Sequence, residues 1–112
     1  MRDVIVTGGR TFKDATFLGM VLHSLLPIGV LAHGAAPGAD TLAARWAKRE
    51  GVCAIAYPPD WSRGRPAGPI RNRVMLLAHP HALVVAFPGG EGTADCVRQA
   101  RKFGMRVFEI AP

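Results

Sequence analysis

Short apolar runs alternate with amphipathic stretches along the whole chain, at a spacing of roughly 25 residues. The runs that predict strands cover residues 3–7, 30–33, 53–57, 82–87 and 106–110. They are continuously apolar, which is typical of parallel strands covered by helices on both faces. The pattern predicts an α/β fold of the Rossmann-like type, with an open parallel five-stranded sheet and helices on both of its faces.

Four amphipathic segments predict the helices between these strands, over residues 13–26, 40–50, 69–78 and 94–103. Each has an apolar stripe expected to face the sheet. These stripes are Phe17, Val21 and Leu25 in the first, Leu42, Ala43, Trp46 and Ala47 in the second, Ile70, Val74 and Leu77 in the third, and Val97, Ala100 and Phe103 in the fourth. Residues 58–68 hold three prolines and two glycines without periodicity, which predicts a loop.

The chain has 112 residues, of which 49% are hydrophobic, enough for one core. We therefore expect a single domain over residues 1–112. The longest apolar helical segment, residues 17–26, is far shorter than the ~20 residues of a membrane span, and the first residues do not read as a signal peptide. These features predict a soluble, cytoplasmic protein without a membrane partner.

The formal net charge of +6 favours an anionic ligand and raises nucleic acid as a partner. The basic residues are scattered, and Trp61 is the main aromatic residue expected to be exposed for stacking on bases. Cys53 and Cys96 are expected to be reduced and mostly buried, and no motif indicates a metal site or a cofactor. The sequence leaves a role for a divalent metal open.

Glycines follow the first two predicted strands, where ligands bind in open parallel sheets. Gly8 and Gly9 would let backbone amides approach an anion, and Arg10 would add a charged contact. Such glycines also serve turns simply through their backbone freedom. After the second strand, the candidate ligand-binding residues are Gly34, Gly38, Ala39 and Asp40. Asp40 is open to two interpretations: an N-cap of the second helix, or a contact to a ligand hydroxyl or a metal-bound water.

The segment after the fourth predicted strand is the sharpest of these turns. Pro88, Gly89, Gly90 and Gly92 precede Thr93, whose hydroxyl is expected to cap the fourth helix. Glycines at a helix start form a cradle for phosphate. The segment has neither the Gly-Lys-Ser/Thr ending of a Walker motif nor the G-x-G-x-x-G pattern.

Two further candidates, Arg71 and Asn72, lie near the start of the third helix, where Pro69 suits the first helical position. A cation there opposes the helix dipole by roughly 0.3–1 kcal/mol, so stability alone does not select it. Both side chains are therefore predicted to reach a ligand phosphate or sugar.

Four segments carry a resemblance to a known family. They are Val-Thr-Gly-Gly-Arg (6–10), His-Gly-Ala-Ala-Pro-Gly-Ala-Asp (33–40), Gly-Pro-Ile-Arg-Asn-Arg (68–73) and Ala-Phe-Pro-Gly-Gly-Glu-Gly-Thr-Ala-Asp (86–95). Together they resemble the YspA-type branch of the SLOG superfamily. That superfamily includes the Lonely Guy phosphoribohydrolases, the DNA-processing protein DprA (Smf) and sensors of nucleotide-derived signals. The resemblance implies a Rossmann-like fold, a nucleotide-type ligand and pairing into a homodimer or higher homo-oligomer.

The Lonely Guy enzymes carry Pro-Gly-Gly-x-Gly-Thr-x-x-Glu, whose Glu is implicated, with an Arg from an earlier helix, in cleaving the N-glycosidic bond of a nucleoside 5′-monophosphate. Here that Glu position is Cys96. The candidate catalytic residues by resemblance are then Arg71 with Asp95 or Glu91 from neighbouring positions. Three functions stay open: such a hydrolase, a module that senses or sequesters a nucleotide, and a less favoured binder of single-stranded DNA resembling DprA.

Overall fold

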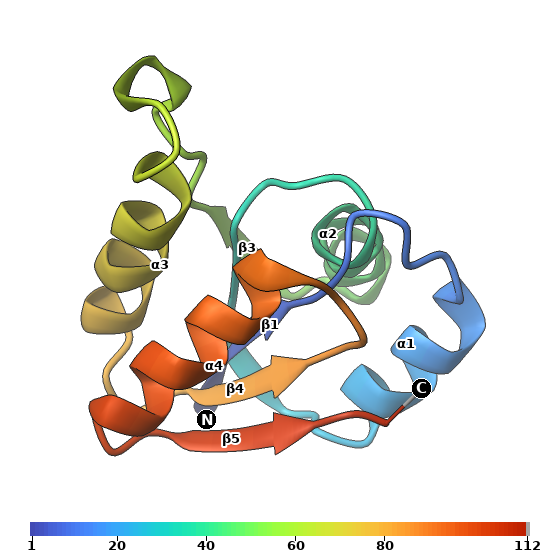
Figure 1. Ribbon diagram of the computed structural model, residues 1–112. Coiled ribbons are helices and arrows are strands. Elements are labelled where there is room, and N and C mark those ends of the chain that lie inside the picture. Colours follow the sequence, from blue (N-terminus) through green and yellow to red (C-terminus); the bar gives the residue numbers. More distant parts are fainter. Residues whose placement is uncertain (112) are drawn as a thin grey trace.

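A computed structural model describes residues 1–111, in which five strands and four helices alternate along the chain (Figure 1). The strands are β1 (Arg2–Thr7), β2 (Ile28–His33), β3 (Cys53–Ala56), β4 (Leu83–Ala86) and β5 (Arg106–Glu109). The helices are α1 (Ala15–His23), α2 (Ala39–Glu50), α3 (Ala67–Ala78) and α4 (Glu91–Lys102), with a short 3₁₀ turn, η1 (Trp61–Arg63), before α3.

The strands form one parallel sheet in the order β3-β2-β1-β4-β5. In the central register, Val6 of β1 lies beside His33 of β2 and Val85 of β4. The chain runs outward from β1 to β3 on one side and from β4 to β5 on the other, so the strand order reverses between β1 and β4. Ligands of open α/β sheets bind in the crevice at this reversal, beyond the carboxyl ends of the strands.

Two hydrophobic clusters lie on opposite faces of this sheet. On one face, Leu22 of α1 and Trp46 of α2 pack with Val4 of β1. On the other, Met75 of α3 and Cys96 of α4 pack against the sheet. The predicted Rossmann-like fold, with helices on both faces, is confirmed. No helix in residues 1–111 is long and apolar enough to cross a membrane.

The buried face of α1 differs from the prediction. The structure buries Leu18 and Leu22, whereas Phe17 is exposed and Val21 and Leu25 are only partly buried. Both stripes have helical spacing and similar hydrophobicity, so periodicity alone did not distinguish them.

The buried face of α3 also differs from the prediction. Ile70, Val74 and Leu77 are exposed, with 41%, 52% and 51% of their surface accessible. The helix instead buries Met75 and Leu76, together with the polar Asn72 and Ala67 at its first residue. The buried stripe includes a polar residue because α4 supplies partners for its amide.

Two helices, α3 and α4, begin two or three residues earlier than predicted. The N-cap of α3 is Pro66, which makes Pro69 the third residue of the helix. The N-cap of α4 is Gly90, so Thr93 is the third residue of α4 and not its cap. Gly92 likewise lies inside α4, where its poor helix propensity had indicated a loop.

The edge strand β3 is more exposed to solvent than expected for a sheet with helices on both faces. Every residue of β3 is exposed, including Cys53, because this strand lies at the sheet edge and the buried stripe of α3 faces the cluster around α4. Phe103, predicted to be core, is 37% exposed just after α4, where the guanidinium of Arg73 lies over its ring. Trp46 and Cys96 are buried as predicted.

Candidate functional site

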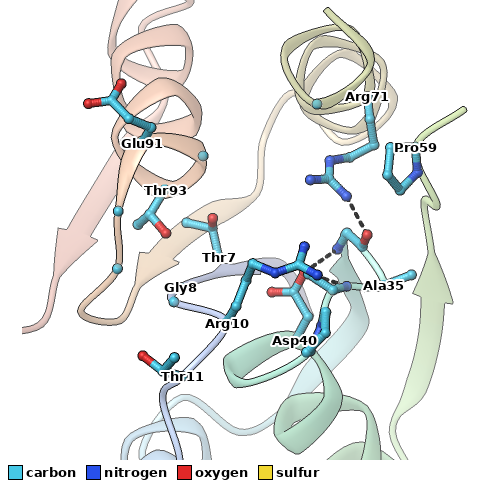
Figure 2. Close-up of a pocket in the computed structure, with 18 of the residues that line it drawn as sticks. Thr7, Gly8, Arg10, Thr11, Ala35, Asp40, Pro59, Arg71, Glu91 and Thr93 are labelled. Atoms are coloured by element: carbon cyan, nitrogen blue, oxygen red, sulfur yellow. Dashed lines mark hydrogen bonds between the residues drawn. The ribbon is translucent and has the colours of Figure 1, made fainter. Parts of the chain in front are cut away.

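A cavity of about 790 Å³ lies at the carboxyl end of the sheet, where the strand order reverses (Figure 2). This volume falls within the ~300–1,000 Å³ typical of small-molecule sites. Its walls come from the turns after β1, β2 and β4, from the start of α3 and from residues near η1. Most of the predicted site residues line it, namely Gly8, Gly9, Arg10, Gly34, Asp40, Arg71, Pro88, Gly89, Gly90, Glu91, Gly92 and Thr93.

The turns after β1 and β4 are locked together by close backbone contacts. The Gly9 amide donates to the Pro88 carbonyl at 2.9 Å, and a Cβ on Gly9 would lie only 2.8 Å from that oxygen. Gly38 has a φ of +81°, and any side chain there would overlap the Gly9 carbonyl. The same carbonyl accepts the Ala39 amide at 3.2 Å. Gly38 and Ala39 therefore hold the turns in place although neither residue lines the pocket.

The Asp40 carboxylate accepts hydrogen bonds from backbone amides of the turn between β2 and α2. Its Oδ2 accepts from the amides of Gly34 at 3.0 Å and Ala36 at 3.3 Å. Gly38, and not Asp40, is the N-cap residue of α2. Two amides that could have faced an anion thus serve a carboxylate of the protein itself.

The Asp40 carboxyl is in an unusual environment. It is 4% exposed, and its Oδ1 has no hydrogen-bond partner within residues 1–111. Burial raises the pKa of Asp40 to about 6, against the opposing effects of the Ala36 and Gly34 amides and of Arg71. Nearby, burial and Arg71 lower the pKa of His33, whose Nδ1 accepts the Ala35 amide at 3.0 Å.

Among the described residues, neither α2 nor α4 has a side-chain cap, but the first amide of α2, that of Ala39, donates to the Gly9 carbonyl, whereas Glu91, Gly92 and Thr93 of α4 line the pocket. The first bond at this end runs from the Ala94 amide to the Gly90 carbonyl at 3.0 Å, so the amides of Glu91, Gly92 and Thr93 precede it. A Cβ built on Gly90 or Gly92 would meet no heavy atom within 4 Å. The first turn of α4 therefore presents uncapped amides and open space to the pocket.

Two arginines bring positive charge to the pocket, one from α3 and one from the turn after β1 (Figure 2). Arg71 is half-buried: its Nη1 donates to the carbonyls of Gly34 and, at 3.3 Å, Tyr57, and its Nε donates to Asn72 Oδ1 at 2.9 Å. Burial lowers the pKa of Arg71, an effect opposed mainly by the charge of Asp40. Arg10 is exposed and forms no salt bridge within the described residues.

Asn72 and Asp95 are not among the residues that line the pocket. Asn72 Nδ2 donates to Asp95 Oδ2 at 2.9 Å and to the Gly92 carbonyl at 3.3 Å. The same Asp95 oxygen accepts from Gln99 Nε2 at 2.9 Å. These bonds join Arg71, through Asn72, to the first turns of α4.

Glu91, the remaining catalytic candidate, lines the pocket and is exposed. The side chain of Cys96, which stands at the Lonely Guy glutamate position, is fully buried. Burial raises the pKa of the Cys96 thiol to about 11. Within residues 1–111, no group of three His, Cys, Asp or Glu side chains is arranged to hold a metal ion.

Several lining residues were not among the predicted site residues. Thr7 and Thr11 flank the Gly-Gly turn, and Pro59 and Trp61 come from the segment predicted only as a loop. The sequence predicts Trp61 solely as an exposed aromatic residue. A tryptophan inside a proline-rich stretch was the available signal, but nothing in the sequence placed it beside the glycine turns.

Comparison with known proteins agrees with this architecture. The sequence model of the YspA, cpYpsA-related SLOG family matches residues 2–64, more than half of the chain. The chain belongs to this family. It is also 40% identical over 122 aligned residues to the Gene 61 protein of Mycobacterium phage D29, an alignment that covers 98% of this chain and 97% of that protein.

A solved structure shares the fold of this SLOG family member. DNA processing protein A (DprA) from Streptococcus pneumoniae superposes with a TM-score of 0.78 at 22% sequence identity. The superposition covers 100% of this chain and 51% of the DprA chain, so this chain spans about half of the DprA length. The likeness confirms the Rossmann-like fold predicted from the sequence.

Proposed function

We propose that this SLOG protein binds a nucleotide-type ligand, with its phosphate at the N-terminus of α4. The observation that carries this proposal is the contrast between the turn after β2 and the first turn of α4, which line one pocket. In the turn after β2, the Asp40 carboxylate already takes the amides of Gly34 and Ala36. At α4, the first-turn amides lack a side-chain cap, and the bare faces of Gly90 and Gly92 leave room for an anion.

The charges around the pocket support an anionic ligand. Arg71 is held in place by the Gly34 and Tyr57 carbonyls and by Asn72, so its orientation is fixed before a ligand arrives. Arg10 has no salt-bridge partner in the described chain and can turn toward a phosphate. The net charge of +6 favours the approach of such a ligand.

The environment of the carboxylates favours binding without turnover. Hydrolysis of an N-glycosidic bond needs a carboxylate beside the sugar. Asp95 is held by Asn72 and Gln99 outside the pocket lining, and a buried thiol stands at the position of the Lonely Guy glutamate. Glu91 is the remaining carboxylate among the predicted catalytic residues that lines the pocket, so the hydrolase alternative rests on it.

Binding is tested by thermal shift and calorimetry with the ribonucleoside 5′-monophosphates, cyclic nucleotides, ribose 5-phosphate and inorganic phosphate. We expect at least one nucleotide to stabilise the protein and to be recovered intact by chromatography. Release of free base that disappears in Glu91→Gln would establish the hydrolase instead. A panel without any binding would refute the proposal.

Two arginine variants make this test specific. Arg10→Ala removes a pocket cation without removing a salt bridge seen in the described chain. We expect it to weaken nucleotide binding by about 10- to 150-fold, the effect of losing one charged hydrogen bond. Arg45→Ala removes an exposed cation from α2 outside the pocket lining and is the matched control. Equal losses in both variants would indicate general electrostatic attraction and not a site.

Binding of nucleic acid and self-association are two less favoured proposals. The net charge supports a test for single-stranded DNA, whose binding would weaken steeply with salt. Ile70, Val74 and Leu77 form an exposed apolar stripe on α3, which supports a homodimer through this helix. Light scattering of the wild type and of Val74→Lys distinguishes a dimer that the variant dissociates from a monomer that it leaves unchanged.

A further inference from the structure

The pocket has a second end, built around Trp61 and unlike the phosphate end in composition. Trp61 is 59% exposed and lines the same cavity as the first turn of α4. A Cβ on Gly68 would lie 3.9 Å from the Trp61 ring, which places that ring beside the start of α3. Isolated exposed apolar side chains are common on protein surfaces, so the position of this residue carries more weight than its exposure.

The backbone beneath Trp61 is fixed by local hydrogen bonds. Asp60 Oδ1 accepts from the Ser62 amide at 3.1 Å, and the Trp61 carbonyl accepts the Gly64 amide at 3.0 Å. The Gly64 carbonyl then accepts the Ala67 amide at 3.1 Å, which ties η1 to α3. The indole is therefore presented from an ordered turn next to a helix.

The two ends of the pocket differ in chemistry and lie on opposite sides. Figure 2 shows Glu91 and Thr93 on one side, and Arg71, Pro59 and Ala35 on the other. The lining also includes Ala36, Pro37 and the indole of Trp61, which add no charge. A ligand that fills both ends has an anion at one extremity and a flat apolar group at the other.

We propose that Trp61 stacks on the aromatic base of the bound nucleotide and is the residue that selects a base-bearing ligand over a bare sugar phosphate. This inference rests on the proposed function, because it takes the phosphate to lie at α4. Stacking suits any base, since every base has a π-face. Pro59 supplies further apolar surface to the same cavity lining, and the indole N–H of Trp61 adds a donor for a polar base edge.

The experiment compares affinities for the four ribonucleoside 5′-monophosphates and for ribose 5-phosphate in the wild type, Trp61→Ala and Trp61→Phe. We expect Trp61→Ala to weaken the best nucleotide about 5- to 150-fold, the range for loss of one base stack, and to leave ribose 5-phosphate unchanged. Trp61→Phe should keep most of the affinity. Phe108→Ala removes an aromatic residue that is 48% exposed on β5, outside the pocket lining, and is the matched control.

Tryptophan fluorescence gives an independent measurement, because Trp46 is buried and Trp61 is exposed. Nucleotides should quench the wild type, whereas ribose 5-phosphate should not. Equal affinity of the wild type for nucleotides and ribose 5-phosphate, or equal weakening of both by Trp61→Ala, would overturn the stacking role while leaving the phosphate site intact. If neither class binds, the proposed function fails, and this inference fails with it.

Discussion

The substitution Gly92→Ala separates the two roles that a glycine in this pocket can have. Gly92 lies inside the first turn of α4, lines the pocket and has no heavy atom within 4 Å of where its Cβ would be. The added methyl therefore enters empty space and disturbs no neighbour in the described protein. It occupies the space in which we place the ligand phosphate.

The expected stability change is a gain. Replacing glycine by alanine at a helical position stabilises a protein by roughly 0.4–1 kcal/mol, because the unfolded chain loses conformational freedom. For a chain of this size, that corresponds to a rise in Tm of roughly 2–6 °C. Binding should change in the opposite direction, because the methyl blocks the approach of phosphate to the first-turn amides. Losing one charge-assisted hydrogen bond would weaken affinity by about 10- to 150-fold.

Calorimetry with the best nucleotide and a thermal melt measure both effects on one sample. Gly19→Ala, in α1, is the matched control, since Gly19 is not a pocket-lining residue and its Cβ would lie 3.4 Å from the Trp46 ring. Gly9→Ala should instead destabilise the fold, because its Cβ would lie 2.8 Å from the Pro88 carbonyl. If Gly92→Ala were more stable and bound the nucleotide as tightly as the wild type, the phosphate would not lie on α4.

Three further predictions concern the pocket and the core. The pKa of Asp40 in the folded protein, about 6, lies above its ordinary value of 3.8. Lowering the pH from 7 to 5 should therefore stabilise the wild type relative to Asp40→Asn by about 1 kcal/mol, as measured by urea titration. Equal pH dependence of the two proteins would contradict the raised pKa. At pH 8 a thiol reagent should modify the exposed Cys53 quickly and the buried Cys96 only after denaturation. Rapid modification of both cysteines would show that α4 opens readily. Arg71→Lys should lower the free energy of unfolding by roughly 1–2 kcal/mol, because an ammonium cannot donate to Asn72 and to the Gly34 and Tyr57 carbonyls with the same geometry. An unchanged free energy of unfolding would mean that these hydrogen bonds make no net contribution to stability.

The sheet was predictable because its signal is local. Each strand is a short apolar run between helical segments, and the regular alternation leaves few arrangements for a parallel sheet. The glycine turns were predictable for a related reason, because strand ends in this fold meet at one edge. The helix faces were harder: α3 offers two apolar stripes, and the one that is buried carries Asn72, whose partners on α4 are distant in the sequence.

The first residue of α4 was predicted too late for a similar reason. Intrinsic propensity argues against a helix that contains Gly92, and a hydroxyl at Thr93 suits an N-cap. Tertiary packing decides otherwise, because Gly89 lies against the Gly9 amide and the Thr93 side chain, with no room for a Cβ. The role of Trp61 depends on the same long-range geometry, since only the folded chain brings η1 to the pocket.

The central claim is that the first-turn amides of α4 bind the phosphate of a nucleotide, and amide NMR spectroscopy tests it most directly in a protein of 12.0 kDa. Titration of the ¹⁵N-labelled protein with the best nucleotide should shift the amide signals of Glu91, Gly92 and Thr93 first and most strongly, and inorganic phosphate should shift the same signals at higher concentration. Nucleotide binding that leaves these three signals unmoved while shifting those of Gly34 and Ala36 would place the phosphate at the turn after β2 and contradict the account.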